Sequence, residues 1–131
     1  MYYKYELKTN NEAFYNITDM VDDAIKKSGV ESGICLVFCP HTTAAITINE
    51  NADEYVAKDV ILASKTAFPK LEGFRHDEGN SDGHVKCSMF GASETLIIDK
   101  GKLVLGVWQD IYFAEFDPPR NRSFFVKIIE G

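Results

Sequence analysis

The chain has 131 residues, of which 45% are hydrophobic and 26% are charged, a composition typical of a globular protein that buries its own core. The net charge of −6 argues against a nucleic-acid-binding surface, which normally carries a basic excess. No apolar run reaches the length of a membrane span, and the first residues lack a signal-peptide core. We therefore expect one cytoplasmic domain over residues 1–131, with no nucleic-acid or membrane partner.

The first third of the chain contains two strand patterns around one helix pattern. Apolar side chains at every second position predict a half-buried strand over residues 2–9. An acidic first turn, an apolar stripe and the stop residue Gly29 predict a helix over residues 18–28. The apolar run over residues 33–39 predicts a buried strand.

The next strand, predicted over residues 42–49, has two contrasting faces. Ala44, Ile46 and Ile48 make one face apolar. The opposite face is polar and carries His41, Thr43, Thr47 and Asn49. Such a polar face is either exposed to solvent or lines a cavity or a subunit interface.

The longest helical pattern covers residues 51–68. Its apolar positions follow helical spacing and are Val56, Val60, Ala63 and Ala67. We expect this stripe to face the core.

The stretch from His76 to Gly91, HDEGNSDGHVKCSMFG, is unusually polar and rich in glycine, and it holds two of the three histidines. Asn80 or Ser81 can cap a short helix that runs to Met89, with Gly91 at its C-terminus. Because such an insertion usually costs stability, we interpret it as part of a functional site.

From Thr95 onward the pattern is β. Lys100-Gly101 is a tight-hairpin signal, and residues 107–116, apolar on both faces, predict a central strand. A turn at Asp117-Pro118-Pro119 precedes a closing strand over residues 124–129. About six to eight strands with two or three helices in irregular order predict an α+β fold with a mostly antiparallel sandwich.

Three histidines, His41, His76 and His84, are the first candidates for chemistry. Imidazole is a good transition-metal ligand, and three imidazoles with one open position would make a catalytic zinc site. The spacing contains no HxH or HExxH motif. Exposed or hydrogen-bonded histidines are therefore the alternative interpretation.

An anion site is suggested by the helix start at Asn80–Gly83, whose free N–H groups suit phosphate, although a plain capped helix has the same pattern. Arg120, mounted after the double proline, suits phosphate or carboxylate, unless it forms a surface salt bridge. Lys86 adds a further positive charge.

Two carboxylates are acid/base candidates. Glu115 shares a strand face with apolar residues, so it is either paired or has a raised pKa. Glu50 could act as an acid/base or as an oxygen ligand for Mg²⁺. The cysteines form no CxxC pair and lack an activating charge, so we expect reduced, unreactive thiols at Cys35, Cys39 and Cys87.

Three stretches together resemble the YjbQ-like family, described as secondary thiamine-phosphate synthase enzymes. They are PHTTAAITINENAD, HDEGNSDGHVKCSMFGAS and LVLGVWQDIYFAEFDPPRNR. The resemblance implies an α+β fold dominated by a β-sandwich and a compact homotrimer with clefts between subunits. It also implies condensation of a hydroxymethylpyrimidine diphosphate with a thiazole phosphate, releasing pyrophosphate.

The resemblance carries the family's site residues onto His41, His76, His84, Asn80, Asp82, Trp108, Gln109, Glu115 and Arg120. The residue patterns and the resemblance together lead us to expect catalytic roles for His41, Glu50, His84 and Glu115. We expect substrate or phosphate contacts from Thr42, Thr43, Asn80, Asp82, Gly83, Gln109 and Arg120. Metal ligands are expected at His41, His76 and His84.

The reaction itself stays open between classes. Diphosphate chemistry normally uses Mg²⁺ and cationic groups, whereas a three-histidine site favours zinc and hydrolytic or lyase chemistry. The alternatives to the condensing enzyme are a metal-dependent hydrolase or lyase acting on a small phosphorylated metabolite and a non-catalytic trimer that binds such a metabolite.

Overall fold

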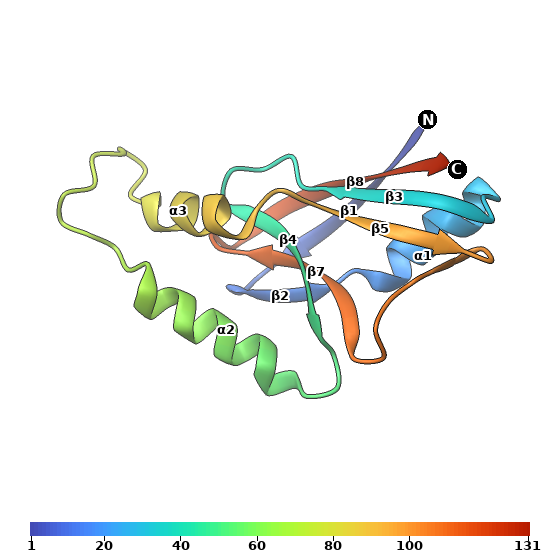
Figure 1. Cartoon of the computed structure of the whole chain (residues 1–131). Coiled ribbons are helices and arrows are strands. Elements are labelled where there is room, and N and C mark those ends of the chain that lie inside the picture. The colour runs from blue at the N-terminus through green and yellow to red at the C-terminus, as the bar shows by residue number, and fades with distance from the viewer.

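A computed structural model describes all residues from 1 to 131. It shows an α+β fold with three helices and two antiparallel sheets (Figure 1). The larger sheet has the strand order β1-β8-β3-β5-β6, with bounds β1 Tyr2–Thr9, β8 Arg120–Glu130, β3 Ser32–Phe38, β5 Ser93–Asp99 and β6 Lys102–Leu103. The smaller sheet has the order β2-β7-β4, with bounds β2 Ala13–Asn16, β7 Gln109–Glu115 and β4 Ala44–Glu50. The helices are α1 Thr18–Ser28, α2 Glu54–Ala67 and α3 Ser81–Phe90.

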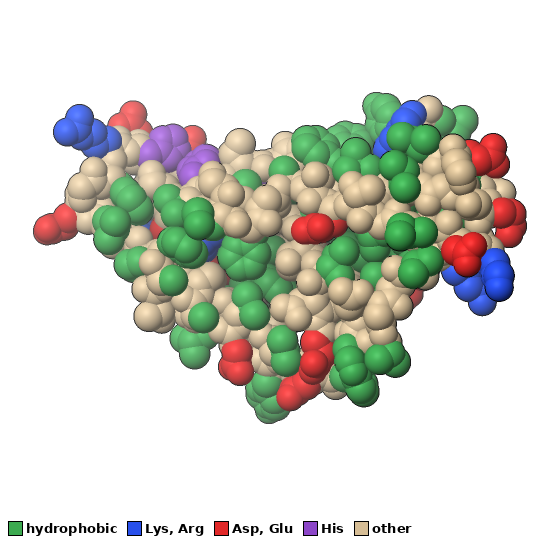
Figure 2. Space-filling model, in the orientation of Figure 1, with side chains coloured by type: hydrophobic (Ala, Val, Ile, Leu, Met, Phe, Trp, Pro, Cys, Tyr) green, Lys and Arg blue, Asp and Glu red, His purple; other side chains and the backbone are tan.

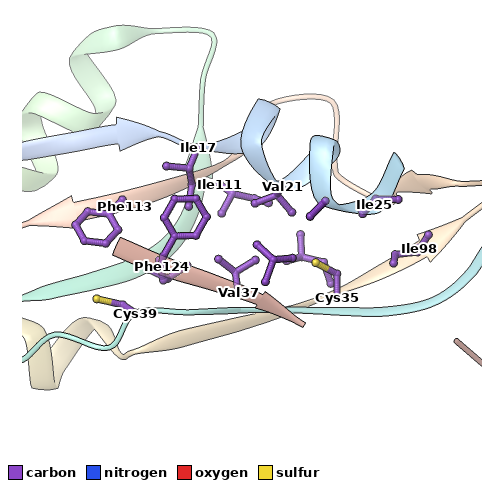
Figure 3. Close-up of a cluster of buried hydrophobic side chains, with 14 of the residues drawn as sticks. Ile17, Val21, Ile25, Cys35, Val37, Cys39, Ile98, Ile111, Phe113 and Phe124 are labelled. Carbon is purple, nitrogen blue, oxygen red and sulfur yellow. The ribbon is translucent and has the colours of Figure 1, made fainter. Parts of the chain in front are cut away.

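The main core lies between the two sheets and α1, and it contains 15 buried residues. In Figure 3, α1 contributes Val21 and Ile25, the five-stranded sheet contributes Val37 and Phe124, and the three-stranded sheet contributes Phe113. A fully buried aliphatic or aromatic side chain contributes about 1.5–3 kcal/mol. The two sheets are thus held together by apolar burial from both of their inner faces.

The predicted helix over residues 18–28 and the antiparallel β architecture are confirmed. The chain leaves α1 at Gly29, whose φ of 68° is left-handed and whose N–H bonds to the carbonyls of Ile25 and Lys26. Lys100 and Gly101 also have positive φ, 52° and 74°, and they form the expected turn between β5 and β6. Left-handed residues of this kind connect strands without disturbing their twist.

The expected orientation of the long helix is wrong in part. α2 buries Ile61 and Ser64, whereas Ala63 and Ala67 of the predicted stripe are exposed. The sheet therefore packs against a neighbouring face of the helix, and the stripe itself forms a partly exposed flank.

The C-terminal strands also differ from their predicted bounds. β7 begins at Gln109, because Val107 and Trp108 lie in an exposed loop. It is the central strand of its sheet, as expected. β8 begins at Arg120 rather than at Phe124, and this difference matters for the site. None of the helices combines the length and the apolar character needed to cross a membrane.

Candidate functional site

A polar pocket of about 370 Å³ lies at the end of the molecule that carries α3. Pro40 is the only one of its lining residues without a polar side chain, and the full lining is Pro40, His41, Thr42, Thr43, His76, Glu78, Asn80, His84, Arg120 and Arg122. We call this hollow the histidine pocket. Histidine side chains gather at this end of the surface in Figure 2.

Three segments distant in sequence form the histidine pocket. They are the β3–β4 connection, the loop between α2 and α3 with the first turns of α3 that follow it, and the start of β8. Two contacts hold the first of these segments against the end of α3. The Cys39 N–H donates to the carbonyl of Ala92 at 2.8 Å, and Cys87 Sγ lies 3.7 Å from the carbonyl oxygen of His41.

His41 is held as a neutral imidazole. Its Nε2 lies 3.0 Å from both the backbone N and the backbone O of Ser123, so it accepts from the N–H or donates to the carbonyl according to the ring tautomer. Burial lowers the pKa of His41, and the positive charge of Arg122 lowers it further. The ring is therefore uncharged near neutral pH and is able to accept a proton only at a reduced pKa.

His76 and His84 form a pair at the rim of the pocket. Their ring centroids are 5.1 Å apart and their planes are nearly perpendicular. No group of three or more His, Cys, Asp and Glu side chains is arranged to hold a metal ion. All three histidines thus line one pocket, and the three-histidine metal site stays a prediction.

The sequence did not identify Arg122, which lies at the back of the pocket and is only 7% exposed. Its Nε donates to Glu115 Oε1 at 2.7 Å, and its Nη2 bonds to Glu115 Oε2. The same Nη2 donates to Thr43 Oγ1 at 2.9 Å. A bidentate pair of this kind fixes the plane of the guanidinium.

Glu115 is a buried carboxylate whose four donors keep it ionised. Thr9 Oγ1 donates to it at 2.5 Å and the Asp117 N–H at 2.7 Å, in addition to the two bonds from Arg122. Burial alone would raise the pKa of Glu115, but the hydrogen bonds from Arg122, Thr9 and Asp117 outweigh burial and lower it. Glu115 therefore stands behind Arg122 and does not itself line the pocket.

Asp117 organises the opposite side of the pocket. Its Oδ2 accepts from Arg120 Nη2 at 2.7 Å and from Asn80 Nδ2 at 2.7 Å. Burial would raise the pKa of Asp117, but these two hydrogen bonds lower it. Because the Asn80 side chain is engaged here, it does not cap α3, and the first N–H groups of that helix are left for another acceptor. Asn80 Oδ1 is buried and has no hydrogen-bond partner.

Several expected site residues lie outside the pocket lining. Asp82 faces Lys86, whose Nζ lies 3.7 Å from Asp82 Oδ2 and 3.0 Å from Glu12 Oε2. Lys86 is thus buried in an ion cluster and offers no charge to the pocket. Gly83 allows α3 to pack closely, because a Cβ there would approach the Phe116 carbonyl oxygen to 3.2 Å.

The two remaining expected residues lie at the far end of the smaller sheet. Glu50 ends β4 and pairs in register with Gln109, whereas the pocket lies at the start of β4. Gln109 Oε1 accepts the Gly106 N–H at 2.8 Å and so shapes the loop before β7. Neither side chain is near the histidines in this chain.

Comparisons with known proteins agree with this architecture. The model of the family described as UPF0047 protein YjbQ-like matches residues 3–131. UPF0047 protein MJ1081 of Methanocaldococcus jannaschii is 52% identical over 130 residues, which cover 98% of this chain and 94% of that protein. UPF0047 protein YugU of Bacillus subtilis is 45% identical, with 92% of each chain covered.

Solved structures show the same fold. A YjbQ/UPF0047 family protein of Clostridium acetobutylicum superposes with a TM-score of 0.94 at 53% identity, covering 97% of this chain and 99% of that one. A YbjQ-like protein of Sulfolobus solfataricus superposes with a TM-score of 0.94 at 31% identity, covering 100% and 97%. This chain belongs to the UPF0047, YjbQ-like family.

Proposed function

We propose that the histidine pocket binds the phosphate groups of a small metabolite and that the protein is an enzyme of the thiamine-phosphate-synthase type. The observation that carries this proposal is the lining itself. Two guanidinium groups and three imidazoles surround one hollow whose lining has a single carboxylate, Glu78. Such a concentration of hydrogen-bond donors, two of them guanidinium groups, suits a phosphate group.

The condensation needs stabilisation of a leaving group more than it needs a base. The lone pair of the thiazole nitrogen forms the new C–N bond, and the electrons of the broken C–O bond leave with the diphosphate. The nitrogen carries no proton in this step, so no proton has to be removed from it. We assign to His84 the role of proton donor to the departing diphosphate. His41 is its neutral partner in the pocket.

A divalent cation normally accompanies a diphosphate and neutralises charge on it. Magnesium prefers oxygen ligands, and the side-chain oxygens of the lining residues are those of Glu78, Thr42, Thr43 and Asn80. Because these include only one carboxylate, Mg²⁺ would be held largely by the substrate oxygens.

The pocket offers no apolar wall for the two substrate rings. We therefore propose that a neighbouring subunit completes the cleft within a homotrimer. Ile34, Phe38, Ile97 and Ile129 are all exposed on the five-stranded sheet, and apolar side chains gathered on one face are typical of an interface. Light scattering tests the assembly: a mass of three times 14.7 kDa supports it, and a species of 14.7 kDa removes the inter-subunit cleft.

Product formation from the two phosphorylated precursors tests the activity. We expect the wild-type protein to form thiamine phosphate and the His84→Ala variant to form it at a rate lower by about a hundredfold or more, the usual contribution of a proton donor. Met89→Ala, on the exposed side of the same helix, is the matched control and should retain the wild-type rate. Equal rates in wild type and His84→Ala, or no product from either, would refute this function.

A metal-dependent hydrolase or lyase is the second candidate, favoured by the close perpendicular pair of His76 and His84. Nε2 of His41 contacts the backbone of Ser123, so Nδ1 is the nitrogen of this ring that could bind a metal. No group of three or more ligand side chains is arranged for a metal ion, so we derive no step through zinc. Metal analysis of protein purified without a histidine tag separates the candidates. Stoichiometric zinc that is lost in His76→Ala supports a metal site, and protein that stays metal-free after equilibration with Zn²⁺ contradicts it. Diphosphate binding without any turnover would instead identify a non-catalytic metabolite-binding protein.

A further inference from the structure

The guanidinium of Arg122 has one edge that the protein leaves unused. Its Nε and Nη2 donate to Glu115 and Thr43, but Nη1 donates no hydrogen bond within the chain. Asn80 Oδ1 is the only fully buried side-chain nitrogen or oxygen atom without a partner. The Nη1 of this buried residue must therefore reach solvent.

Arg122 borders two hollows, and the alternation of side chains along β8 indicates which of them its guanidinium faces. A groove of about 580 Å³ runs along β1 and β8, lined by Lys4, Glu6, Leu7, Lys8, Asn121, Arg122 and Ser123. Asn121 and Ser123 alternate with Arg122 along β8, so their side chains leave the opposite face of the sheet. The Arg122 guanidinium contacts Thr43 and Glu115, and Thr43 lines the histidine pocket. Nη1 thus opens toward the histidine pocket, and the groove meets the backbone of Arg122.

We propose that Arg122 is the fixed anion-binding group at the inner end of the histidine pocket and takes a phosphate or diphosphate group on its Nη1 edge. This deepens the proposed function and relies on it only for the nature of the anion. Arg122 suits the role because Glu115 and Thr43 already hold the guanidinium plane. Binding an anion therefore requires little further loss of side-chain conformational entropy.

Arg120 also leaves its Nη1 without a hydrogen bond in the chain, because its Nε donates to the Asp117 carbonyl and its Nη2 to the Asp117 carboxylate. It differs from Arg122 in burial, since Arg120 is exposed whereas Arg122 is buried with Glu115 and Thr43. An exposed charge is screened by solvent and contributes less to binding an anion. We therefore assign Arg120 a secondary contact at the pocket mouth.

Glu115 becomes a positioning residue under this assignment. Its carboxylate accepts four hydrogen bonds, so it has no free lone pair directed to a substrate. Its effect on binding is exerted through the orientation of Arg122.

Titration calorimetry with inorganic diphosphate tests the assignment without any turnover. Arg122→Lys and Arg120→Lys are a matched pair, since each keeps the charge and removes the planar fork. We expect Arg122→Lys to weaken diphosphate binding by about tenfold to a hundredfold, the loss of one or two charge-assisted hydrogen bonds. We expect Arg120→Lys to weaken it by about threefold or less, as for an exposed charge. Equal losses in the two variants, or a larger loss in Arg120→Lys, would overturn the assignment.

A measurement on the wild-type protein guards against misfolding of Arg122→Lys. Arginine side-chain ¹⁵N spectra should show diphosphate-dependent shifts at the Arg122 guanidinium that exceed those at Arg120. Unchanged Arg122 signals at saturating diphosphate would contradict the assignment. The outcome is separate from the proposed activity: absence of condensation with Arg122-dependent diphosphate binding refutes the enzyme and leaves the anion site standing.

Discussion

The two walls of the histidine pocket are built in opposite ways. The inner wall lies on strands: Glu115 ends β7, Arg122 lies in β8, and both are buried in one hydrogen-bonded network. The outer wall is a loop in which every residue from 69 to 79 is exposed, and Figure 1 shows it projecting from the body between α2 and α3. His76 and Glu78 reach the pocket from this loop. The proposed site thus combines a buried, hydrogen-bonded inner end with a rim that is exposed to solvent.

The largest effect is expected from breaking the inner wall. Arg122→Met leaves the Glu115 carboxylate buried and unpaired, which should lower the free energy of unfolding by about 3–5 kcal/mol. Chemical denaturation monitored by circular dichroism measures this loss. The double variant Glu115→Gln/Arg122→Met should recover part of the loss, because no buried charge is left without a partner. A loss below about 1 kcal/mol in the single variant, the range of an exposed pair, would show that the Glu115–Arg122 network contributes little to stability.

Low pH should destabilise the same hydrogen-bonded network of Glu115 and Arg122. The folded-state pKa of Glu115 is lowered, so its contribution to stability is fully present above the unfolded pKa of about 4.3 and is lost as the pH falls through the lower folded value. We expect the wild-type free energy of unfolding to fall below about pH 4, by up to about 1.4 kcal/mol per pH unit for this group. The Glu115→Gln/Arg122→Met variant should show a shallower slope. Parallel slopes would assign the acid sensitivity to other carboxylates.

Two glycines give a matched comparison of sheet and loop. At Gly33 in β3 a Cβ would lie 2.1 Å from the carbonyl oxygen of Ile129 in the paired strand β8, whereas nothing lies within 4 Å of a Cβ at Gly73 in the loop. Gly33→Ala should therefore push the strands apart and cost about 1–3 kcal/mol. Gly73→Ala should change stability by no more than about 0.5 kcal/mol. Thermal unfolding of both variants checks the contrast, and equal melting temperatures would contradict it.

Local patterns were sufficient for the fold class but not for every packing face. The period of two in residues 2–9 and the stop at Gly29 depend on near neighbours, and the structure confirms both elements. The face of α2 that packs is chosen by the sheet beneath it, which lies elsewhere in the sequence. Helical spacing therefore predicted the helix but placed Ala63 and Ala67 on the wrong side.

The same distinction applies to the site. The motifs around His41 and Asn80 were visible as polar residues in unusual places, and they do line one pocket. Arg122 was missed because the closing strand was expected to begin at Phe124, which left the arginine outside any strand pattern. Its pairing with Glu115 crosses the turn between β7 and β8, and no periodicity reports such a contact. A strand begun at Arg120 would have placed Arg122 on the same face as the buried Phe124, and an arginine on a core face requires a buried acid.

The smallest effect is expected at the rim. His76 is exposed, and its close ring contact is His84, so His76→Ala should leave the free energy of unfolding within about 0.5 kcal/mol of wild type. Diphosphate binding, measured by the calorimetric titration, should weaken by about threefold or less, the value of one solvent-exposed contact. The loop would then act as a cover whose individual side chains matter little, in contrast to Arg122. A loss of about tenfold or more would instead make His76 a primary ligand-binding residue. The loop that carries it is exposed in the free protein, so it would then have to become ordered when the ligand binds.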